Sequence, residues 1–416
     1  SMWLELLREF FQDLKAQRTR AILTIVAITW GTVAVVLLMS FGEGLGTQME
    51  NGLVNAGNRI MILYGGETGK QYEGMAKGRK IRLLEEDASM LREAIPAIAM
   101  ISPQYRNSVT LTRGKFTTTT ECEGVNPLFE EMRRMYPAAG GRFLNDADVV
   151  QQRRSLVLGG KIAEEIFGKE YPVGQIISID GVPFTVVGLL QKKLQTAMNN
   201  GPDDQRAIVP YSTFRTMYGY EHVNSLVVRP GDPSRQEELK EEIFRVLARK
   251  YHFDPTDERT LFIWDFIEAE KIGQKIALGV TIFLGSVGLL TLLIAGVGVA
   301  NVMYVVVKER THDIGVKMAL GARKSYIHMQ IIFEALLLSF LGGAIGTLIS
   351  VAVVGVVRLI PSDGEIGAMQ FLGKPVLSAT IILLTAGILA AIGLLAGFFP
   401  ARRAAAVDPV ESLRYE

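Results

Sequence analysis

Residues 276–307 read IALGVTIFLGSVGLLTLLIAGVGVANVMYVVV and contain no Asp, Glu, Lys or Arg. Three more stretches share this property, namely 21–41, 335–357 and 375–401. Because about 20 helical residues cross the ~30 Å apolar core of a bilayer, each stretch is long enough to span a membrane. Four such stretches predict an α-helical membrane protein and argue against the buried helices of a large soluble protein.

Outside these stretches the chain has the composition of an ordinary folded protein. It has 416 residues, of which 49% are hydrophobic and 21% charged, a net charge of +1 and one cysteine. These values exclude a disordered chain and a disulfide-stapled module, and the lack of a basic excess argues against a nucleic-acid-binding protein. The mean hydropathy is +0.24 although a fifth of the residues are charged, so the apolar residues must lie in blocks.

The Lys and Arg residues that flank the apolar stretches predict the orientation of the chain, since cytoplasmic flanks carry an excess of them. Four lie in 1–20, five in 308–325 and three in 400–416, but only two in 358–376. We therefore expect both termini to be cytoplasmic and the long segment 42–275 to be external.

This orientation and the apolar stretches divide the chain into nine segments. Residues 1–20 have apolar side chains at helical spacing, which predicts an amphipathic helix in the inner membrane interface. Helical patterns at 44–55 and 266–275 adjoin the first two spans and are expected to extend them outward as stalks. The segments are a cytoplasmic amphipathic helix (1–20), span one (21–41), an external domain with stalk helices (42–275), span two (276–307), a cytoplasmic link helix (308–325), span three (326–357), a short external loop (358–376), span four (377–399) and a cytoplasmic tail (400–416).

The external domain has the pattern of a split α+β layer that holds an inserted subdomain at about 121–221. Its first and last parts share a β-α-β order and are expected to pair into one layer. A hairpin precedes the insert, and the insert contains a further strand, helix and hairpin. The predicted strands are 59–64, 108–112, 115–123, 155–158, 176–180, 184–190, 226–229 and 261–264, and the predicted helices are 84–94, 161–167 and 234–250, the last with Ser234 as its cap.

Sequence motifs for catalysis are missing from the chain. Residues 65–71, GGETGKQ, resemble a phosphate-binding loop, but Tyr64 stands where that motif needs its first Gly, and no Ser or Thr follows the Lys. The four histidines lack metal-ligand spacing, and the single Cys122 cannot form an intramolecular disulfide. We therefore predict no catalytic, cofactor-binding or metal-binding residues. Cys122, expected outside, would instead serve as a labelling probe of topology.

The centres of the spans lack ionisable residues, which favours a bundle that transmits motion over one that conducts ions or protons. Small residues in the motifs 342–346 and 393–397 predict close contacts between helices. Asn301 is expected to form an interhelical hydrogen bond, and Glu334, at the start of span three, is expected to reach toward the membrane interface.

The link 308–325 mixes charged residues with four apolar ones, Ile314, Val316, Met318 and Leu320. A short helix here would present apolar side chains and a few ion pairs to a partner protein, as interfaces do. The alternative is a solvated turn whose acidic first residues and basic last residue offset the helix dipole. Apolar residues beside charges are typical of an interface patch, which favours docking.

The same link carries a family resemblance. Residues 296–303, GVGVANVM, lead into 309–322, ERTHDIGVKMALGA, and this run resembles the signature of MacB/FtsX-type ABC transporter permeases, the type VII or mechanotransmission class. The tail 400–414, PARRAAAVDPVESLR, and the entry to span one, RTRAILT at 18–24, are similar to that family as well. Asp313 stands where the family usually has Glu, which shortens the reach of the carboxylate.

The resemblance implies a fold and a set of partners. The fold is four transmembrane helices plus a large α+β periplasmic domain, in the bacterial inner membrane. The chain would be a permease subunit and not an enzyme, paired with a second copy of itself and with two ABC ATPase subunits that bind ATP and Mg. Because the chain starts about 20 residues before span one, the ATPase is expected to be a separate protein. Other implied partners are a periplasmic adaptor, an outer-membrane channel and membrane lipids.

The resemblance also implies which residues couple the chain to the ATPase. They fall in the link and in the C-terminal tail. The positions are Glu309, Arg310, Thr311, Asp313, Ile314, Gly315, Lys317, Ala319, Gly321, Ala322, Pro400, Arg402, Arg403, Pro409, Leu413 and Arg414.

Within the family, three roles fit the sequence. The first is adaptor-coupled tripartite efflux or export, the second is release of lipoproteins, and the third is FtsX-like regulation of a cell-wall hydrolase. The large, two-part external domain favours export. The substrate stays open, with drugs, peptides, toxins and siderophores all possible.

Overall fold

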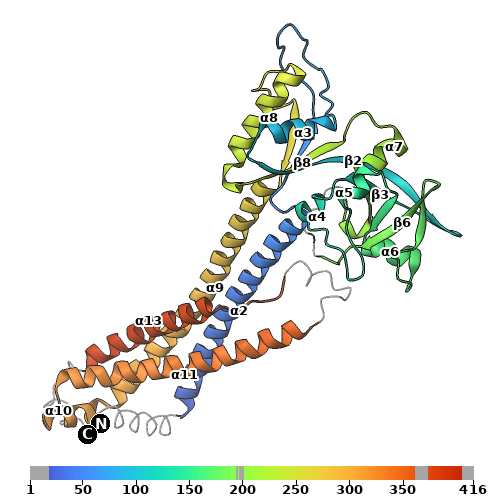
Figure 1. The fold of residues 1–416 in the computed structure, drawn as a ribbon. Helices are drawn as coiled ribbons and strands as arrows, with labels where there is room; N and C mark the ends of the chain where they lie inside the picture. The colour runs from blue at the N-terminus through green and yellow to red at the C-terminus, as the bar shows by residue number, and fades with distance from the viewer. Residues whose placement is uncertain (1–17, 194, 196–200, 361–372, 405–416) are drawn as a thin grey trace. The chain divides into compact units, whose positions relative to one another are not determined.

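The computed structural model describes residues 18–193, 195, 201–360 and 373–404 (Figure 1). Most of the predicted helix 1–20, most of the loop 358–376 and the end of the tail lie outside these residues. The chain divides into two compact units. We call Ser1–Gln48 with Lys275–Glu416 the helical unit, and Met49–Gln274 the sheet unit.

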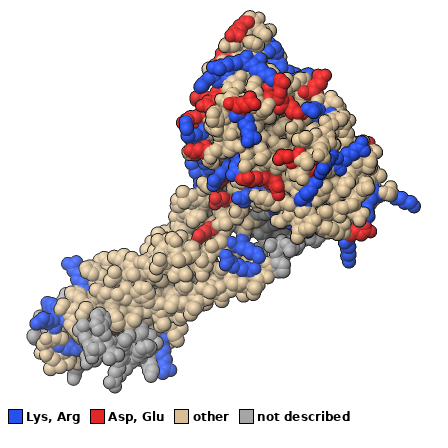
Figure 2. Space-filling view, in the orientation of Figure 1, with Lys and Arg blue, Asp and Glu red and all other residues tan. Residues whose placement is uncertain are grey.

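The helical unit contains four helices that are long and apolar enough to cross a membrane, which confirms the predicted class of fold. On the face shown in Figure 2, these helices carry few Lys, Arg, Asp or Glu side chains along most of their length. The predicted stalk segments belong to the first two, which run on past their apolar stretches. The helices are α2 (Arg18–Ala56), α9 (Phe266–Glu309), α11 (Lys324–Leu359) and α13 (Ala379–Ala404), and a short helix α10 (Thr311–Ala319) joins α9 to α11.

Glycines let these helices approach closely, as the two small-residue motifs predicted. A Cβ atom on Gly346 of α11 would lie 2.7 Å from the Cβ of Thr32 on α2. A Cβ atom on Gly397 of α13 would lie 3.0 Å from the Cα of Ile332 on α11. Backbones this close gain dispersion contacts that larger side chains would prevent. Trp30 of α2 is 71% exposed, so it does not disturb this packing.

One prediction about the spans, that of Asn301, is wrong. Asn301 is exposed and, within the described residues, bonds to no other helix, because it shares an outward face of α9 with Ile294 and Val297. Glu334 is 7% exposed, and its carboxylate lies 3.6 Å from Arg310 Nη1, at the start of the link. Pro400, where the predicted tail begins, is buried inside α13, which continues to Ala404.

The sheet unit is built on one sheet of nine strands in the order β3-β7-β4-β6-β5-β2-β8-β1-β9. Within it, β2, β8, β1 and β9 pair antiparallel, and α3 and α8 connect them in the two β-α-β halves that the sequence predicted. The strands are β1 (Met61–Gly65), β2 (Ile98–Arg113), β3 (Phe116–Val125), β4 (Ser155–Leu158), β5 (Ile176–Ile179), β6 (Val182–Leu189), β7 (Arg206–Pro210), β8 (Ser225–Pro230) and β9 (Leu261–Asp265). The helices are α3 (Glu86–Ala94), α4 (Phe129–Met132), α5 (Asp146–Val150), α6 (Gly160–Phe167), α7 (Tyr211–Tyr218), α8 (Gln236–Tyr251) and the 3₁₀ turns η1 (Asp203–Gln205) and η2 (Pro233–Arg235).

The long strand β2 belongs to both parts of the sheet unit. Its residues 98–104 pair with β8 of the layer, and its residues 105–113 pair with β3 of the insert. Only 108–112 was predicted as strand, because Pro103 interrupts the pattern, and proline is rare inside sheets. The insert therefore grows out of a strand of the layer and shares its backbone.

The predicted cap at Ser234 is wrong. Ser234 lies inside η2, where its N–H and its hydroxyl both donate to the Asp232 carboxylate, at 2.9 and 2.7 Å. Helix α8 begins only at Gln236. Asp232 instead caps η2, because its carboxylate accepts both donors of Ser234, and the N-cap residue of α8 is Arg235.

Candidate functional site

Helix α10 is short because polar groups fix both of its ends. The Thr311 hydroxyl donates to the carbonyls of Val307 and Lys308, at 3.2 and 2.8 Å, where α9 ends. At the other end Gly321 has φ +95°, a left-handed conformation that glycine adopts at little cost. The N–H of the next residue, Ala322, returns to the carbonyl of Lys317 at 3.0 Å. The link is therefore a defined helix and not a plain turn.

Two ion pairs join the start of α10 to neighbouring helices. Glu309 Oε1 lies 2.6 Å from Arg20 Nη1 at the start of α2, and both side chains are more than 40% exposed. Arg310 Nη1 lies 3.6 Å from Glu334 Oε1 on α11, with 21% and 9% exposure, and Gln330 donates to the same carboxylate at 3.4 Å. The second pair is the less screened of the two, because water reaches it less.

The two faces of α10 differ. Ile314 is 7% exposed and packs in a core with Ile327 and Ile331 of α11, so the expectation that it is presented outward is wrong. Its helical periodicity places it on the inward face of α10. Leu320, just after the helix, is instead 84% exposed. An exposed leucine in a link that also carries charged residues is the kind of anchor that protein interfaces use.

A cavity of about 430 Å³ lies where α9, α10 and α11 meet. Apolar side chains such as Met303 and Ile331 form part of its wall, and Arg310 and Glu334 supply polar groups. The combination of an apolar wall with a few polar groups suits the insertion of a side chain or a small ligand.

The tail residues divide into three kinds. Arg403 places its guanidinium 4.6 Å from the centre of the Tyr304 ring on α9, a cation–π contact that brings the end of α13 to the end of α9. Arg402 is exposed and Pro400 is buried. The predicted positions Pro409, Leu413 and Arg414 lie outside the described residues.

Some contributors to this site were not predicted as coupling residues. Glu334, Gln330 and Tyr304 lie within the apolar spans, where the sequence pattern assigns them to packing or to the interface. The one sequence signal for Glu334 is that it is a carboxylate at the edge of an uncharged run. Such a group needs a cation nearby, so its position could have predicted an ion pair. Leu320 was named among the apolar residues of the link but not among the coupling positions.

Four membrane-spanning helices, a short helix between the second and third, and an α/β unit between the first and second define a permease-like membrane protein. The family comparisons make the class specific. Residues 21–246 match the MacB-like periplasmic core domain, and residues 285–409 match the FtsX-like permease C-terminal domain. The chain belongs to the MacB/FtsX family of ABC transporter permeases.

Relatives of known name align with nearly the whole chain. The macrolide export ATP-binding/permease protein MacB of Bdellovibrio bacteriovorus is 30% identical over 420 residues, which cover 99% of this chain and 62% of that protein. The pyoverdine export ATP-binding/permease protein PvdT of Pseudomonas syringae pv. syringae is 30% identical over 403 residues, covering 96% and 57%. The chain thus spans about three fifths of the length of these relatives.

A solved structure, the periplasmic region of MacB from Actinobacillus actinomycetemcomitans, is also similar. It is 21% identical, covers 53% of this chain and 94% of that one, and superposes with a TM-score of 0.42.

Proposed function

We propose that this chain is the permease subunit of a MacB-type ABC transporter and that it converts the motion of ATPase subunits into a conformational change of the sheet unit, for tripartite efflux or export. Family membership supports this proposal, and so do the names of relatives that combine an ATP-binding part with a permease part. Two ATPase subunits holding ATP and Mg, a second copy of this chain, a periplasmic adaptor and an outer-membrane channel are the partners.

The orientation follows from the positive flanks. The termini and α10 lie in the cytoplasm, and the sheet unit lies in the periplasm. Lys and Arg concentrate in 308–325 and are sparse in 358–376, which is the bias that sets membrane orientation. Helices α2 and α9 are each longer than a bilayer core requires, which would let them carry motion beyond the membrane.

The placement of α10 carries the proposal. Ile314 and the Arg310–Glu334 pair hold the helix to α11, while Leu320 points away from the chain's own core. A partner that grips Leu320 would therefore move α10, and the spans attached to it would follow. An isolated exposed leucine has no stabilising role in the chain itself, since burial is what makes leucine stabilising.

A crosslinking experiment tests this docking. A photoreactive amino acid is placed at Leu320 in one variant and at Leu359 in another, and each is expressed in the native bacterium. Leu359 is the matched control, because it is the same residue type, 82% exposed against 84%, at the opposite end of α11. We expect an ATP-binding subunit to be captured from position 320 and not from 359. Capture from 359 alone, or from neither, would overturn the docking proposal.

Cysteines at the same two positions test the orientation. The natural Cys122 is 1% exposed, and burial raises the pKa of its thiol well above the ordinary value. We therefore expect the reagent not to label Cys122, which cannot serve as the topology probe that the sequence suggested. A membrane-impermeant thiol reagent added to cells with a permeable outer membrane should label Leu359→Cys and spare Leu320→Cys. The reverse pattern would invert the topology.

A further inference from the structure

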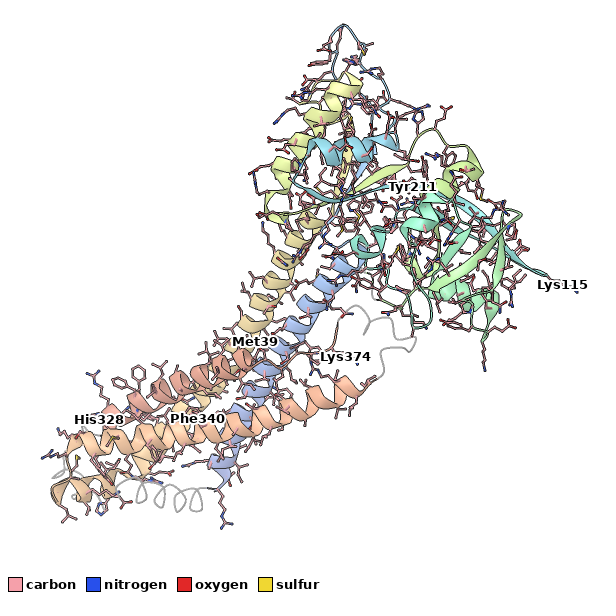
Figure 3. The ribbon with its side chains drawn as sticks, in the orientation of Figure 1. Met39, Lys115, Tyr211, His328, Phe340 and Lys374 are labelled. Atoms are coloured by element: carbon pink, nitrogen blue, oxygen red, sulfur yellow. The ribbon has the colours of Figure 1, made fainter. Side chains whose placement is uncertain are left out.

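The sheet unit contains a cleft of about 740 Å³ that the proposed function does not use. One wall comes from the start of α3 and from β2, and the other from α7 and the residues after it. Tyr211, the first residue of α7, marks the cleft in Figure 3. Its volume lies within the range of about 300–1,000 Å³ that is usual for small-molecule sites. The side chains that decide its chemistry are Glu85, Tyr105, Asn126, Tyr211, Arg215 and Tyr220.

A carboxylate lies at the centre of this lining. Glu85 accepts a hydrogen bond from the Tyr105 hydroxyl at 2.9 Å and another from Arg215 Nη1 at 2.7 Å. Both donors, which belong to the lining, are thus engaged with one carboxylate. Burial, and then the hydrogen bond to Glu85, raise the pKa of Tyr105 far above its ordinary value, so this tyrosine stays a neutral donor at every physiological pH.

Aromatic rings form part of the same wall. The rings of Tyr105 and Tyr220 stack with centroids 6.2 Å apart. The ring of Phe214 also stacks with that of Tyr105, at a centroid distance of 5.8 Å. Tyr211 adds a third tyrosine to the wall. The faces of such rings carry negative charge and attract cations.

One buried hydrogen-bond acceptor in the lining of the cleft lacks a donor. Asn126 donates its amide N–H to the carbonyl of Ile101 at 2.9 Å, but its Oδ1 is buried and has no partner within the described residues. A buried acceptor without a donor is costly, so a ligand that brings an N–H or O–H group would satisfy it. The lining also includes the carboxylates of Glu86 and Glu221 and one further guanidinium, that of Arg92.

We propose that this cleft binds an organic cation, an ammonium group carried on an apolar body of the size of one or two rings. The ammonium group would sit against the rings of Tyr211 and Tyr220, which are partly exposed, and near the Glu85 carboxylate, and an N–H would reach Asn126. The apolar body would contact Ile101 and Pro103. This binding is a property of the sheet unit and does not depend on the proposed transport function.

Ligand binding is measured on the full chain in a neutral detergent. The probe is benzylammonium, which is water-soluble and carries the N–H donors that the proposal requires, and benzenesulfonate is the anion of matched size. Saturation-transfer NMR and equilibrium dialysis follow each probe. We expect saturable binding of the cation with a single site per chain, at least tenfold tighter than the anion. Absence of saturable cation binding, or equal binding of the anion, would overturn the proposal.

Variants then locate the site. Glu85→Gln keeps an acceptor but removes the charge, and Tyr220→Leu removes an aromatic face without touching the ion pair. Each is expected to weaken cation binding by about 3- to 30-fold, the range of a cation–π or charge contact at a partly buried site. Glu93→Gln, an exposed carboxylate on the same helix α3, is the matched control and should bind as the unaltered chain does.

Folding of the variants is checked by thermal unfolding. If Glu85→Gln fails to fold, Tyr220→Leu decides the test alone. Cation binding that survives unchanged in a folded Tyr220→Leu variant places the ligand elsewhere and sinks the assignment of this cleft.

Discussion

Two ion pairs, one from each unit, differ in burial. In the sheet unit Arg133 and Asp203 are 0% and 3% exposed, and the Arg133 Nη2 donates to Asp203 Oδ1 at 2.8 Å. In the helical unit the Arg20–Glu309 pair is more than 40% exposed on both sides. Buried charges cost a great deal to separate, whereas exposed pairs exchange partners almost freely. The first arrangement fixes one geometry, and the second lets a geometry change.

The buried charges of the sheet unit form a connected cluster. Lys193 Nζ contacts Asp203 Oδ2 at 2.6 Å and also donates to the carbonyl of Asn55, in the last turn of α2, at 2.7 Å. Arg206 pairs with Glu123, which is 0% exposed. The cluster therefore ties the insert to the end of α2 that belongs to this unit. The helical unit instead joins its helices by close glycine contacts, such as that of Gly346.

Removing the central anion should have the largest effect. Asp203→Ala leaves the charges of Arg133, Lys193 and Arg206 buried without their shared partner, and we expect it to destabilise the sheet unit by about 3–5 kcal/mol, the usual cost of breaking a buried pair. Thermal unfolding in detergent, followed by circular dichroism, measures it. Glu164→Ala removes one side of an exposed pair with Lys192 and should leave the melting curve nearly unchanged. A small change in melting temperature for Asp203→Ala would mean that water reaches the cluster more than its burial indicates.

Lys193 makes the stability of the cluster depend on pH. Burial, only partly offset by Asp203, lowers the pKa of Lys193 to about 8. Above that pH the folded chain loses a proton that the unfolded chain keeps until about pH 10.4. The unfolded state then binds more protons, so stability rises with pH by up to ~1.4 kcal/mol per unit in this window and is flat below it.

The variant Lys193→Met isolates this contribution. The difference in melting temperature between the unaltered chain and Lys193→Met is measured at pH 7, 8, 9 and 10. We expect the difference to shift in favour of the unaltered chain above pH 8. A constant difference would show that Lys193 has an ordinary pKa.

Glycine contacts in the helical unit should show a smaller effect. Gly346→Ala places a methyl group 2.7 Å from the Cβ of Thr32 and 2.8 Å from the carbonyl oxygen of Thr29, so the helices must separate. We expect a loss of about 1–3 kcal/mol, as for overpacking elsewhere. Gly355→Ala on the same helix meets no atom within 4 Å and should be neutral or slightly stabilising. Equal melting temperatures for the two variants would contradict the packing.

The contrast between the units also separates what the sequence could predict from what it could not. Uncharged runs and the two β-α-β patterns are local signals, so the four spans and the split layer were predictable. The buried cluster was not predictable, because Arg133, Lys193 and Asp203 are charged residues of the kind that usually lie on the surface. Only the folded sheet brings them together, across a separation of 70 residues between Arg133 and Asp203.

The site around α10 was predictable in part. The motif predicted the region, and the residues Arg310 and Arg403 do lie at one end of the bundle. Which residues face inward was not predictable, because Ile314 and Leu320 are both apolar and their exposures of 7% and 84% depend on how α10 packs on α11. Likewise Asn301 points outward because the contacts of α9 are made by its opposite face.

The smallest effect on stability is expected for the exposed pair at the start of α10. Glu309→Gln removes its charge, and because exposed pairs contribute about 0–1 kcal/mol, the melting temperature should change by less than about 3 °C. Arg20→Gln should change the melting temperature by a similar amount, and the double variant should have the same melting temperature as either single variant. A larger loss would mean that Glu309 is held by more than Arg20.

The functional effect of Glu309→Gln is a separate measurement on the same variant. If the pair aligns α2 with α10 during the ATPase cycle, transport should fall while the melting curve stays in place, because a contact that costs little to break can still set the direction of a motion. Purified transporter, assembled with its ATPase, is assayed for ATP hydrolysis and for transport in parallel. Hydrolysis that continues with reduced transport supports coupling through this pair, whereas unchanged transport assigns coupling to Arg310, Glu334 and the buried side of α10 alone.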